Sequence, residues 1–327
     1  MLETFGCVNL RCFKNKKFDF SDFTLIEGKN GSGKTTILEG IYICVRGRSF
    51  LTGRLSNLVR HGEYFFKIES IFEGNTISVF YDGKNKKKDF LFNEKKENAL
   101  NISLRFPVFV FNARLLNSIR NDVVTLYKFF NIVLSFYDKS YLKALSDYSR
   151  ALREKRALLT FEGENDTINA WNTIILERSK ILRKKRENFV KKINNSIEED
   201  LKVVYKVKIS EKEEKSLFQR EIKEKRVLTG CHKDRFFILN KNKDMRLFLS
   251  SGQQKAVFFD ILKTIGFIFS EKTGKKPVLL LDDFDSEFDN TNLSNSLKRV
   301  ISNFQIVLTT TDKRKFANFD FNLLSLG

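Results

Sequence analysis

Residues 28–35 constrain the fold of this chain more than any other stretch, because they read Gly-Lys-Asn-Gly-Ser-Gly-Lys-Thr. The spacing is that of the phosphate-binding P-loop, G-x-x-x-x-G-K-T. An apolar run at 23–27 precedes it, and apolar residues at 37, 38, 41 and 42 follow with the spacing of a helix face. Glycines are needed because backbone N–H groups must surround a phosphate with no side chain in the way. A strand, a glycine-rich turn and a helix together predict a nucleotide-phosphate site.

The expected ATP-binding positions run from the turn into the helix that follows it. They are Gly28, Lys29, Asn30, Gly31, Ser32, Gly33, Lys34, Thr35 and Thr36. The N-terminus of that helix adds free N–H groups and the positive end of the helix dipole. We expect Lys34 to reach the β- and γ-phosphates and the Thr35 hydroxyl to hold Mg²⁺. A chance match in a glycine-bearing turn is the alternative, and the flanking strand and helix argue against it.

An acidic motif ends a second apolar run. Residues 277–281 read Pro-Val-Leu-Leu-Leu, and Asp282 and Asp283 follow. This is the Walker B pattern, in which a buried strand delivers a carboxylate to Mg²⁺. Alone such a run is a weak signal, since many buried strands end in Asp, but a P-loop needs this partner. We expect Asp282 to hold Mg²⁺ and Lys34, Asp282 and Asp283 to form the catalytic set.

Another candidate anion site lies at residues 249–254, Leu-Ser-Ser-Gly-Gln-Gln, where a helix is predicted to begin. Small hydroxyl residues and a glycine at a helix N-terminus favour a bound anion. A head-to-tail dimer would use both this helix start and the P-loop. In it, the signature residues of one subunit would close over the ATP γ-phosphate held by the other; they are Ser250, Ser251, Gly252 and Gln253. An ordinary Ser N-cap is the alternative.

Together these motifs resemble the ATPase heads of ABC proteins. More narrowly, the chain resembles the RecF family of bacterial recombination-mediator ATPases, which is related to the SMC proteins. The resemblance covers nearly the whole length, and beyond the P-loop it rests on segments at 9–13, 47–50, 58–62, 230–234, 251–255 and 281–289. It implies an α/β fold, with an ABC-type P-loop ATPase head and an inserted α-helical hairpin lobe.

The resemblance also implies a function. A RecF-like protein forms a homodimer on ATP, binds double-stranded DNA and single-strand/duplex junctions, and helps load recombinase at single-strand gaps. Its implied partners include RecO- and RecR-like mediator proteins. The implied cofactors are ATP and Mg²⁺.

The chain departs from the family pattern at several places. Lys233-Asp234-Arg235 stands where the family has Arg-Asp-Asp, and segments 112–115 and 127–131 match poorly. ABC ATPases carry a longer Glu at the position of Asp283, and often a His in the region of residues 309–311, which are all Thr here. A shorter carboxylate and a missing imidazole weaken the positioning of water, so any ATP hydrolysis should be slow.

The middle of the chain predicts the inserted lobe. Apolar residues at 134, 137, 141, 145, 148 and 152 indicate one amphipathic helix, and those at 175, 182, 189, 193, 197 and 201 a second, joined by a turn at 161–166. Beyond them we expect a strand and a charged loop over 203–217, then strands at 227–230, 236–239 and 246–249, helices over 252–269 and 293–301, and a strand at 305–310. Before them we expect the helix after the P-loop to end near Gly47, a β-hairpin between 64–72 and 76–81, and a strand at 107–111. The predicted head therefore comprises 1–115 and 226–327, and the helical lobe 116–225.

Charge favours a polyanionic partner. The chain has 59 Lys and Arg against 40 Asp and Glu, a net charge of +19, and such an excess suits nucleic acid. The expected DNA contacts lie on the second hairpin helix; they are Arg178, Arg183, Lys184, Lys185 and Arg186. For any one of them, a solvated helix face is the alternative.

Four cysteines without metal-ligand spacing indicate reduced thiols, and no signal peptide or membrane span is apparent, so we expect a cytoplasmic protein without a membrane partner. Two other functions stay open. One is the soluble ATPase subunit of a transporter, which fits the signature but fits the hairpin and the charge less well. The other is a RecF-like DNA binder that has lost turnover.

Overall fold

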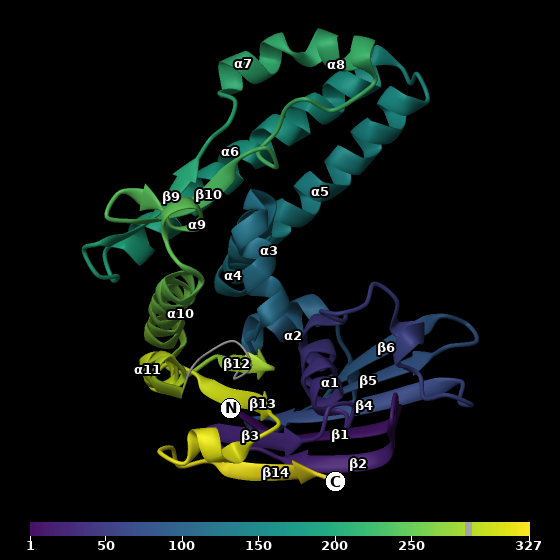
Figure 1. Cartoon of the computed structure of the whole chain (residues 1–327). Coiled ribbons are helices and arrows are strands. Elements are labelled where there is room, and N and C mark those ends of the chain that lie inside the picture. The colour runs from purple at the N-terminus through teal and green to yellow at the C-terminus, as the bar shows by residue number, and fades with distance from the viewer. Residues whose placement is uncertain (285–289) are drawn as a thin grey trace. The chain divides into compact units, whose positions relative to one another are not determined.

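A computed structural model describes residues 1–284 and 290–327, so residues 285–289 of the resemblance segment 281–289 lie outside the described residues. The chain divides into two compact units (Figure 1): Met1–Asn117 with Ser250–Gly327, and Ser118–Leu249. We expected the helical lobe to span 116–225. Residues 226–249 lie with it as well, because strand β10 (Arg235–Asn240) pairs with β9 (Leu201–Lys206).

The first unit contains a five-stranded parallel sheet that leads into the P-loop. Its strands lie in the order β14 (Asn322–Leu326), β3 (Phe23–Gly28), β13 (Gln305–Thr310), β12 (Val278–Asp282) and β8 (Val108–Asn112). Strands β12 and β13 are buried along their whole length, as the apolar runs at 278–281 and 306–308 predict for parallel strands covered on both faces. The strands predicted at 23–27, 107–111, 277–281 and 305–310 are confirmed; β14 was not predicted.

An antiparallel sheet forms the rest of the β-structure in this unit. Its strands lie in the order β2 (Phe13–Asp19), β1 (Leu2–Leu10), β4 (Phe65–Phe72), β5 (Asn75–Asp82), β6 (Lys87–Phe92) and β7 (Lys95–Lys96). The hairpin predicted between 64–72 and 76–81 is confirmed. It turns through Glu73 and Gly74, both in the left-handed region with φ of 52° and 70°.

Helix α1 (Lys34–Arg46) contacts strands of both sheets. It is buried on all sides from Thr36 to Val45, as expected for a helix that is apolar all round. A Cβ at Gly40 would lie 2.2 Å from Phe5 Cζ, so glycine lets α1 approach β1 closely. The helix ends at Gly47, which has φ of 66° and closes it as an αL cap. The predicted end is confirmed.

Among the described residues, the first unit also contains α2 (Ala99–Arg105), α10 (Ser251–Thr273), α11 (Asn290–Val300) and two short 3₁₀ helices, Leu55–Leu58 and Lys313–Phe316. The helices predicted at 252–269 and 293–301 are confirmed as α10 and α11. Helix α3 (Ala113–Asn121) crosses the boundary between the units.

The second unit is built on the predicted helical hairpin. Helix α5 (Lys139–Thr160) packs against α6 (Asn165–Asn194), and α4 (Val123–Tyr137) precedes them. The single helix expected through 134–152 is wrong, because Asp138 interrupts it. The Asp138 carboxylate accepts the N–H groups of Ser140 and Tyr141 and caps α5, and this capping starts a new helix.

A three-stranded antiparallel sheet, β11 (Lys243–Asp244), β10 and β9, and three short helices complete this unit: α7 (Glu211–Ser216), α8 (Phe218–Glu224) and α9 (Met245–Phe248). The charged loop expected before 217 is wrong, because Ser210 and Glu213 form a capping box that starts α7. The strand expected at 246–249 is likewise wrong; Asp244 caps α9 there. Segment 227–230 is not a strand, and Leu201 begins β9 rather than extending α6.

Candidate functional site

The turn between β3 and α1 has the backbone geometry that a phosphate loop needs. Gly31 and Gly33 adopt φ of 84° and 101°, a region that glycine enters without steric cost. A Cβ at Gly33 would lie 2.5 Å from Phe13 Cζ and 2.7 Å from Cys12 Sγ. The turn between β1 and β2 therefore lies close against the loop. Since Gly33 is the N-cap of α1, the free N–H groups of this helix start at the loop.

Two polar groups of the loop have hydrogen-bonding capacity that a ligand could use. Lys34 is 5% exposed, and its Nζ donates to the carbonyl oxygens of Gly28 and Lys29 at 2.7 and 3.1 Å. An ammonium has three donors, so one remains for an incoming anion. Ser32 Oγ is buried and has no hydrogen-bond partner among the described residues. A buried polar atom left unsatisfied in this way fits a site that a phosphate group completes.

The acidic strand end lies beside the loop, as the sequence predicts. Thr35 Oγ1 donates to Asp282 Oδ1 at 3.0 Å, across 247 positions of the chain. Burial raises the pKa of Asp282, and the neighbouring Asp283 raises it further. A hydroxyl and a carboxylate in contact at the C-terminal end of a buried strand are hard oxygen ligands of the kind that Mg²⁺ prefers. A bound cation would also favour the ionised carboxylate.

Thr309, at the end of β13, completes this corner of the site and was missed as a ligand-supporting residue. Its Oγ1 donates to Asp282 Oδ1 at 3.0 Å and accepts the backbone N–H of Asp283 at 2.9 Å. The hydroxyl therefore links the two acids. The signal was available, because a Thr at the end of a strand next to β12 in a parallel sheet must lie at the same edge as Asp282.

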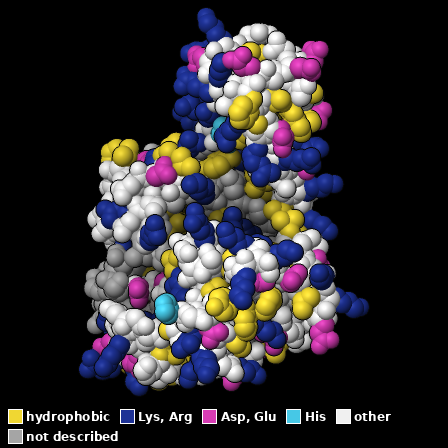
Figure 2. All heavy atoms as spheres, turned by 90° about the vertical axis from the view of Figure 1, so that its right-hand side faces the viewer, with side chains coloured by type: hydrophobic (Ala, Val, Ile, Leu, Met, Phe, Trp, Pro, Cys, Tyr) yellow, Lys and Arg dark blue, Asp and Glu magenta, His cyan; other side chains and the backbone are white. Residues whose placement is uncertain are grey.

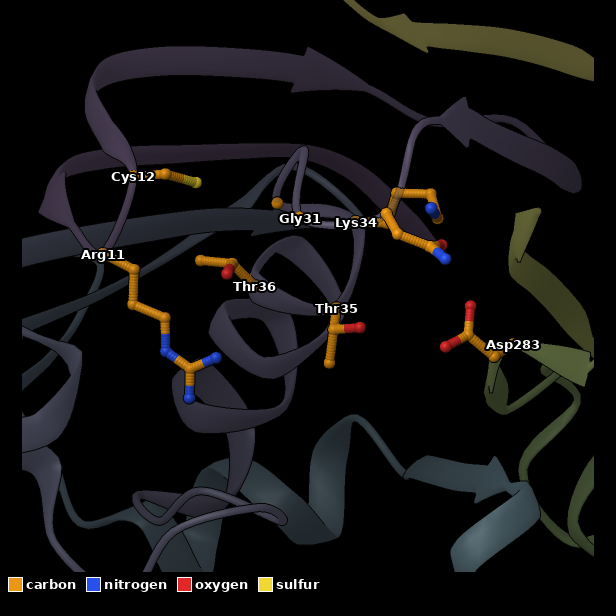
Figure 3. Close-up of a pocket in the computed structure, with 9 residues that line it drawn as sticks. Arg11, Cys12, Gly31, Lys34, Thr35, Thr36 and Asp283 are labelled. Atoms are coloured by element: carbon orange, nitrogen blue, oxygen red, sulfur yellow. The ribbon is translucent and has the colours of Figure 1, made fainter. Parts of the chain in front are cut away.

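A cavity of about 400 Å³ opens over the loop. Residues from both sides line it (Figure 3): Arg11, Cys12, Asn30, Gly31, Gly33, Lys34, Thr35, Thr36 and Asp283. Figure 3 shows the Asp283 carboxylate on the side of the cavity that carries Lys34 and Thr35. Asp283 adopts φ of 47°, a conformation uncommon outside glycine. Such a backbone, held by Thr309, fixes the direction of its carboxylate.

Arg11 and Cys12 enter this cavity from the turn between β1 and β2, and sequence reasoning had given them no individual role. Arg11 NH2 lies 2.7 Å from the Glu39 carboxylate, which also accepts the Ser49 hydroxyl. Glu39 is 1% exposed, and burial raises its pKa while Ser49 and Arg11 oppose this rise. The buried carboxylate thus holds Arg11 at the cavity rim.

The signature segment forms a helix start with a capping box. Ser250 Oγ accepts the Gln253 N–H at 3.4 Å, and the Ser250 N–H donates to Gln253 Oε1 at 3.0 Å. A Cβ at Gly252 would meet nothing within 4 Å. Ser250, Ser251, Gly252 and Gln253 are not among the residues that line the P-loop cavity. The Ser N-cap is therefore present, and the contact of this segment with a phosphate on a second subunit stays a prediction.

The expected DNA contact is wrong for Arg186, which lies in the interior of the second unit, and Arg183 is partly buried and held by two ion pairs. Arg186 is 0% exposed and donates to four side chains and a carbonyl: those of Tyr127, Asn131, Tyr141, Tyr205 and Cys231. Arg183 is paired with Asp234 and Glu214, each at 2.9 Å. The Arg186 guanidinium satisfies buried polar groups and is closed to solvent, whereas the charge of Arg183 is neutralised by its two carboxylate partners.

The other three predicted contacts differ among themselves. Lys185 pairs with Asp138 at 2.6 Å and Arg178 with Asp147 at 3.2 Å, so both are partly neutralised. Lys184 is exposed, and its role stays a prediction. Over the face drawn in Figure 2, dark-blue Lys and Arg side chains outnumber the magenta Asp and Glu side chains. The excess charge is therefore spread beyond α6. Among the helices that the structure describes, none has the length and apolar character of a membrane span.

The parallel sheet, the glycine turn and the contact between Thr35 and Asp282 define a P-loop ATPase head of the ABC and SMC type. A solved SMC head domain with an extended coiled coil, from Pyrococcus furiosus, shares the fold with a TM-score of 0.54 at 16% identity, over 98% of this chain and 92% of that chain. A family model described as an AAA domain matches residues 7–306.

Relatives identify the family more narrowly. DNA replication and repair protein RecF of Flavobacterium johnsoniae is 30% identical over 92% of this chain and 90% of its own length, and that of Lachnospira eligens is 29% identical over 97% and 94%. The solved recombination mediator protein RecF of the RecFOR pathway, as RecF-ATPrS, gives a TM-score of 0.85 at 26% identity, over 96% of this chain and 93% of that chain. The chain belongs to the RecF family of DNA replication and repair proteins.

Proposed function

We propose that this chain binds ATP with Mg²⁺ at the P-loop. The observation that carries the proposal is the hydrogen bond from Thr35 to Asp282, which brings two predicted Mg²⁺ ligands into contact. The unsatisfied Ser32 hydroxyl and the free donor of Lys34 support it. A relative of the same family is solved as RecF-ATP, over 96% of this chain. Lys29, Asn30 and Thr36 would add contacts from the loop and the first helical turn.

Turnover is proposed to be slow. Mg²⁺, when bound, neutralises charge on the phosphates. Lys34 would bind the same phosphates, and Thr35 and Asp282 would hold the metal. Asp283 would orient water toward the reacting phosphate, but its side chain is one methylene shorter than Glu. Beside it stands Thr309, a neutral hydroxyl with no basic nitrogen. Loose positioning of water is expected to limit the rate, because phosphoryl transfer depends chiefly on positioning and charge stabilisation.

ATP is proposed to join two chains. The open helix start at Ser250 and Gly252 would contact the γ-phosphate held by a second copy, which explains why this segment does not line the cavity of its own chain. The dimer would grip double-stranded DNA near single-strand gaps in the cytoplasm and assist recombinase loading. The names DNA replication and repair protein and RecFOR pathway, printed for its relatives, support DNA and RecO- and RecR-like proteins as partners.

Two measurements, of duplex binding and of ATP binding, test whether ATP at the P-loop controls DNA binding. Binding of a labelled duplex is measured by fluorescence anisotropy without nucleotide, with ATP, and with ADP. We expect tight binding with ATP only, and the Lys34→Ala variant should lose both ATP binding and the ATP-dependent gain in DNA binding while keeping its circular dichroism spectrum. A wild-type protein that binds duplex equally well in all three conditions would contradict ATP control. ATP affinity that is intact in Lys34→Ala would contradict the P-loop assignment.

A further inference from the structure

A group of cations surrounds the turn at 230–233 in the second unit. Its members come from four places in the chain and are named here the 233 cluster: Arg156 on α5, Lys208 beyond β9, Lys233 in the turn, and Arg235 at the start of β10. Arg156 and Lys208 are exposed, whereas Lys233 and Arg235 are half-buried. Arg226 lies close by but pairs with Glu224 at 2.6 Å.

Buried hydrogen bonds bring these cations together. Asp234 accepts the backbone N–H of Lys208 at 3.0 Å. The Arg235 guanidinium donates to the carbonyls of His232 and Asp234, at 3.1 and 2.8 Å. Tyr148 on α5 contacts His232 Nδ1 at 2.7 Å and so ties the turn to the helix that carries Arg156. The positions of the cluster are therefore fixed by the fold.

Glycine at position 230 permits this arrangement. Its φ is 110°, and a Cβ there would lie 2.3 Å from the Tyr148 hydroxyl. Any larger residue would push the turn away from α5 and separate Arg156 from Lys233. The close approach thus serves to set the turn, with its cations, against the helix.

No carboxylate is left over to neutralise the 233 cluster. The nearby buried acids already have partners: Asp234 and Glu214 pair with Arg183, and Glu221 pairs with Lys155. Two buried cations, Lys155 and Arg186, together with the partly buried Arg183, face these three buried carboxylates. Among the described residues, no acid lies within ion-pair distance of Arg156, Lys208, Lys233 or Arg235.

The positive charges of the 233 cluster repel one another when no anion is bound. Burial lowers the pKa of Lys233, and Lys208, Arg156, Arg235 and Arg226 lower it further, in that order. Like charges held together without a counter-ion destabilise a fold, and a bound anion would remove this repulsion. Such an arrangement is more typical of a binding site than of a structural ion-pair network.

We propose that the 233 cluster binds the phosphodiester backbone of nucleic acid. The proposal rests on the proposed DNA-binding function and deepens it, because it assigns the contact to a surface other than α6. Because Arg156 and Lys208 are exposed and Lys233 and Arg235 are half-buried, phosphates of one strand can approach the cluster from solvent. Guanidinium groups bind phosphate oxygens through two parallel N–H donors. Contacts of this kind give affinity without sequence preference.

The test neutralises the two exposed members with the double substitution Arg156→Gln and Lys208→Gln. The matched control is Lys143→Gln with Lys223→Gln, which removes the same charge from exposed positions on α5 and α8. Duplex affinity is measured by anisotropy with ATP present across a salt series. We expect the cluster variant to lose roughly tenfold in affinity per cation at about 0.1 M salt and to flatten the salt slope by about one per cation. The control should change by less than about threefold.

Each outcome decides one question. A wild-type protein that binds no duplex contradicts the proposed function itself. If the wild type binds and both double variants weaken equally, diffuse attraction explains binding and the 233 cluster is no site. If the cluster variant binds like the wild type, the assignment is also wrong. If it loses ATP affinity and keeps duplex affinity, the cluster serves a nucleotide phosphate, and the backbone assignment is overturned.

A third variant separates binding from folding. Lys233→Gln removes a half-buried cation that its neighbours repel, so its melting temperature should equal or exceed that of the wild type, while duplex affinity falls. A variant that melts lower and binds duplex normally would show that Lys233 is a structural residue. That result would remove the turn from the proposed site.

Discussion

At the residue scale, Asp283 is the residue on which the rate of ATP hydrolysis at the proposed site is expected to depend. Its carboxylate lines the cavity, and its backbone N–H is held by Thr309. The Asp283→Asn variant keeps the size and the backbone contact but loses the negative charge that would orient water. We expect ATP affinity to remain within about threefold of the wild type while turnover falls at least tenfold, on the scale of general-base losses. Single-turnover assays with radiolabelled ATP measure both.

The wild-type rate tests the same reasoning. A turnover number of ~1–100 s⁻¹, as in kinases, would contradict slow hydrolysis by a shortened acid. The Asp283→Glu variant is the informative companion, because it restores the longer side chain at that position. If the length of the acid limits the reaction, Asp283→Glu should be faster than the wild type.

His232 makes folding sensitive to acid. Burial lowers its pKa to about 3, and Lys233, Arg156, Arg235 and Arg186 contribute. In the unfolded chain its pKa is near the ordinary value of 6.5, so the unfolded state takes up a proton first as pH falls. The free energy of unfolding contributed by His232 is therefore complete above pH 6.5 and is lost progressively toward pH 3. Between pH 7 and 5 this amounts to about 2 kcal/mol.

Urea unfolding at pH 7 and pH 5 measures this effect. The free energy of unfolding of His232→Gln should fall by about 2 kcal/mol less than that of the wild type over that interval. The variant should already be less stable at pH 7, because Tyr148 loses its hydrogen bond to His232 Nδ1. His61 is exposed, and His61→Gln is the matched control for the loss of an imidazole. Equal pH dependence in all three proteins would mean that His232 is protonated as readily in the folded as in the unfolded chain.

At the element scale, the N-terminus of α10 carries the prediction about dimerisation. Ser250 caps this helix, and its neighbour Gly252 leaves the helix end open. Ser250→Arg should keep ATP binding and block the ATP-dependent dimer, because a bulky side chain would stand where a second chain's phosphate is proposed to dock. Light scattering with a slowly hydrolysed ATP analogue checks the oligomeric state.

The control for this variant is Ser250→Ala, which removes the cap without adding bulk. Each substitution should cost about 1 kcal/mol of stability through the lost cap. Only Ser250→Arg should abolish the dimer. If both variants lose it, the cap and not the phosphate contact is responsible; a nucleotide-independent dimer would contradict the trans arrangement altogether.

Elements with strong local signals could be predicted from the sequence. The buried strands β3, β8, β12 and β13 are rich in apolar residues, and the P-loop fixes the start of α1. The break at Asp138 and the capping box at Ser210 and Glu213 were missed because the apolar stripe continues past the first and charge hides the second. In both cases a capping side chain outweighed the periodicity of the segment.

In the candidate site, too, residues in local sequence motifs could be predicted and residues brought together only by the fold could not. Lys34, Thr35 and Asp282 belong to motifs with fixed spacing, so their proximity could be predicted. Arg183 and Arg186 were misassigned because a charge run on a helix does not reveal which cations turn inward. The partners of Arg183, which are Asp234 and Glu214, lie 51 and 31 positions away along the chain, and only the fold brings them together. The same is true of Arg11 at the rim of the P-loop cavity.

At the scale of the whole molecule, net charge governs how DNA binding responds to salt. A chain with a net charge of +19 attracts any polyanion, and duplex DNA releases counterions when its phosphates are neutralised. If about six phosphates are contacted, affinity with ATP should fall by ~10³-fold or more between about 50 and 200 mM salt. Binding should not depend on base sequence, because backbone contacts carry no sequence information.

A comparison of ATP-bound and ADP-bound protein across the same salt series distinguishes duplex binding by an ATP-closed dimer from diffuse electrostatic attraction by a single chain. Diffuse attraction by one chain should be present with either nucleotide. A dimer closed by ATP would place two such surfaces on one duplex and add phosphate contacts, so the salt slope should be steeper with ATP than with ADP. Equal slopes, with affinities that differ by a constant factor, would mean that ATP changes the amount of competent protein and not the number of phosphates each complex contacts.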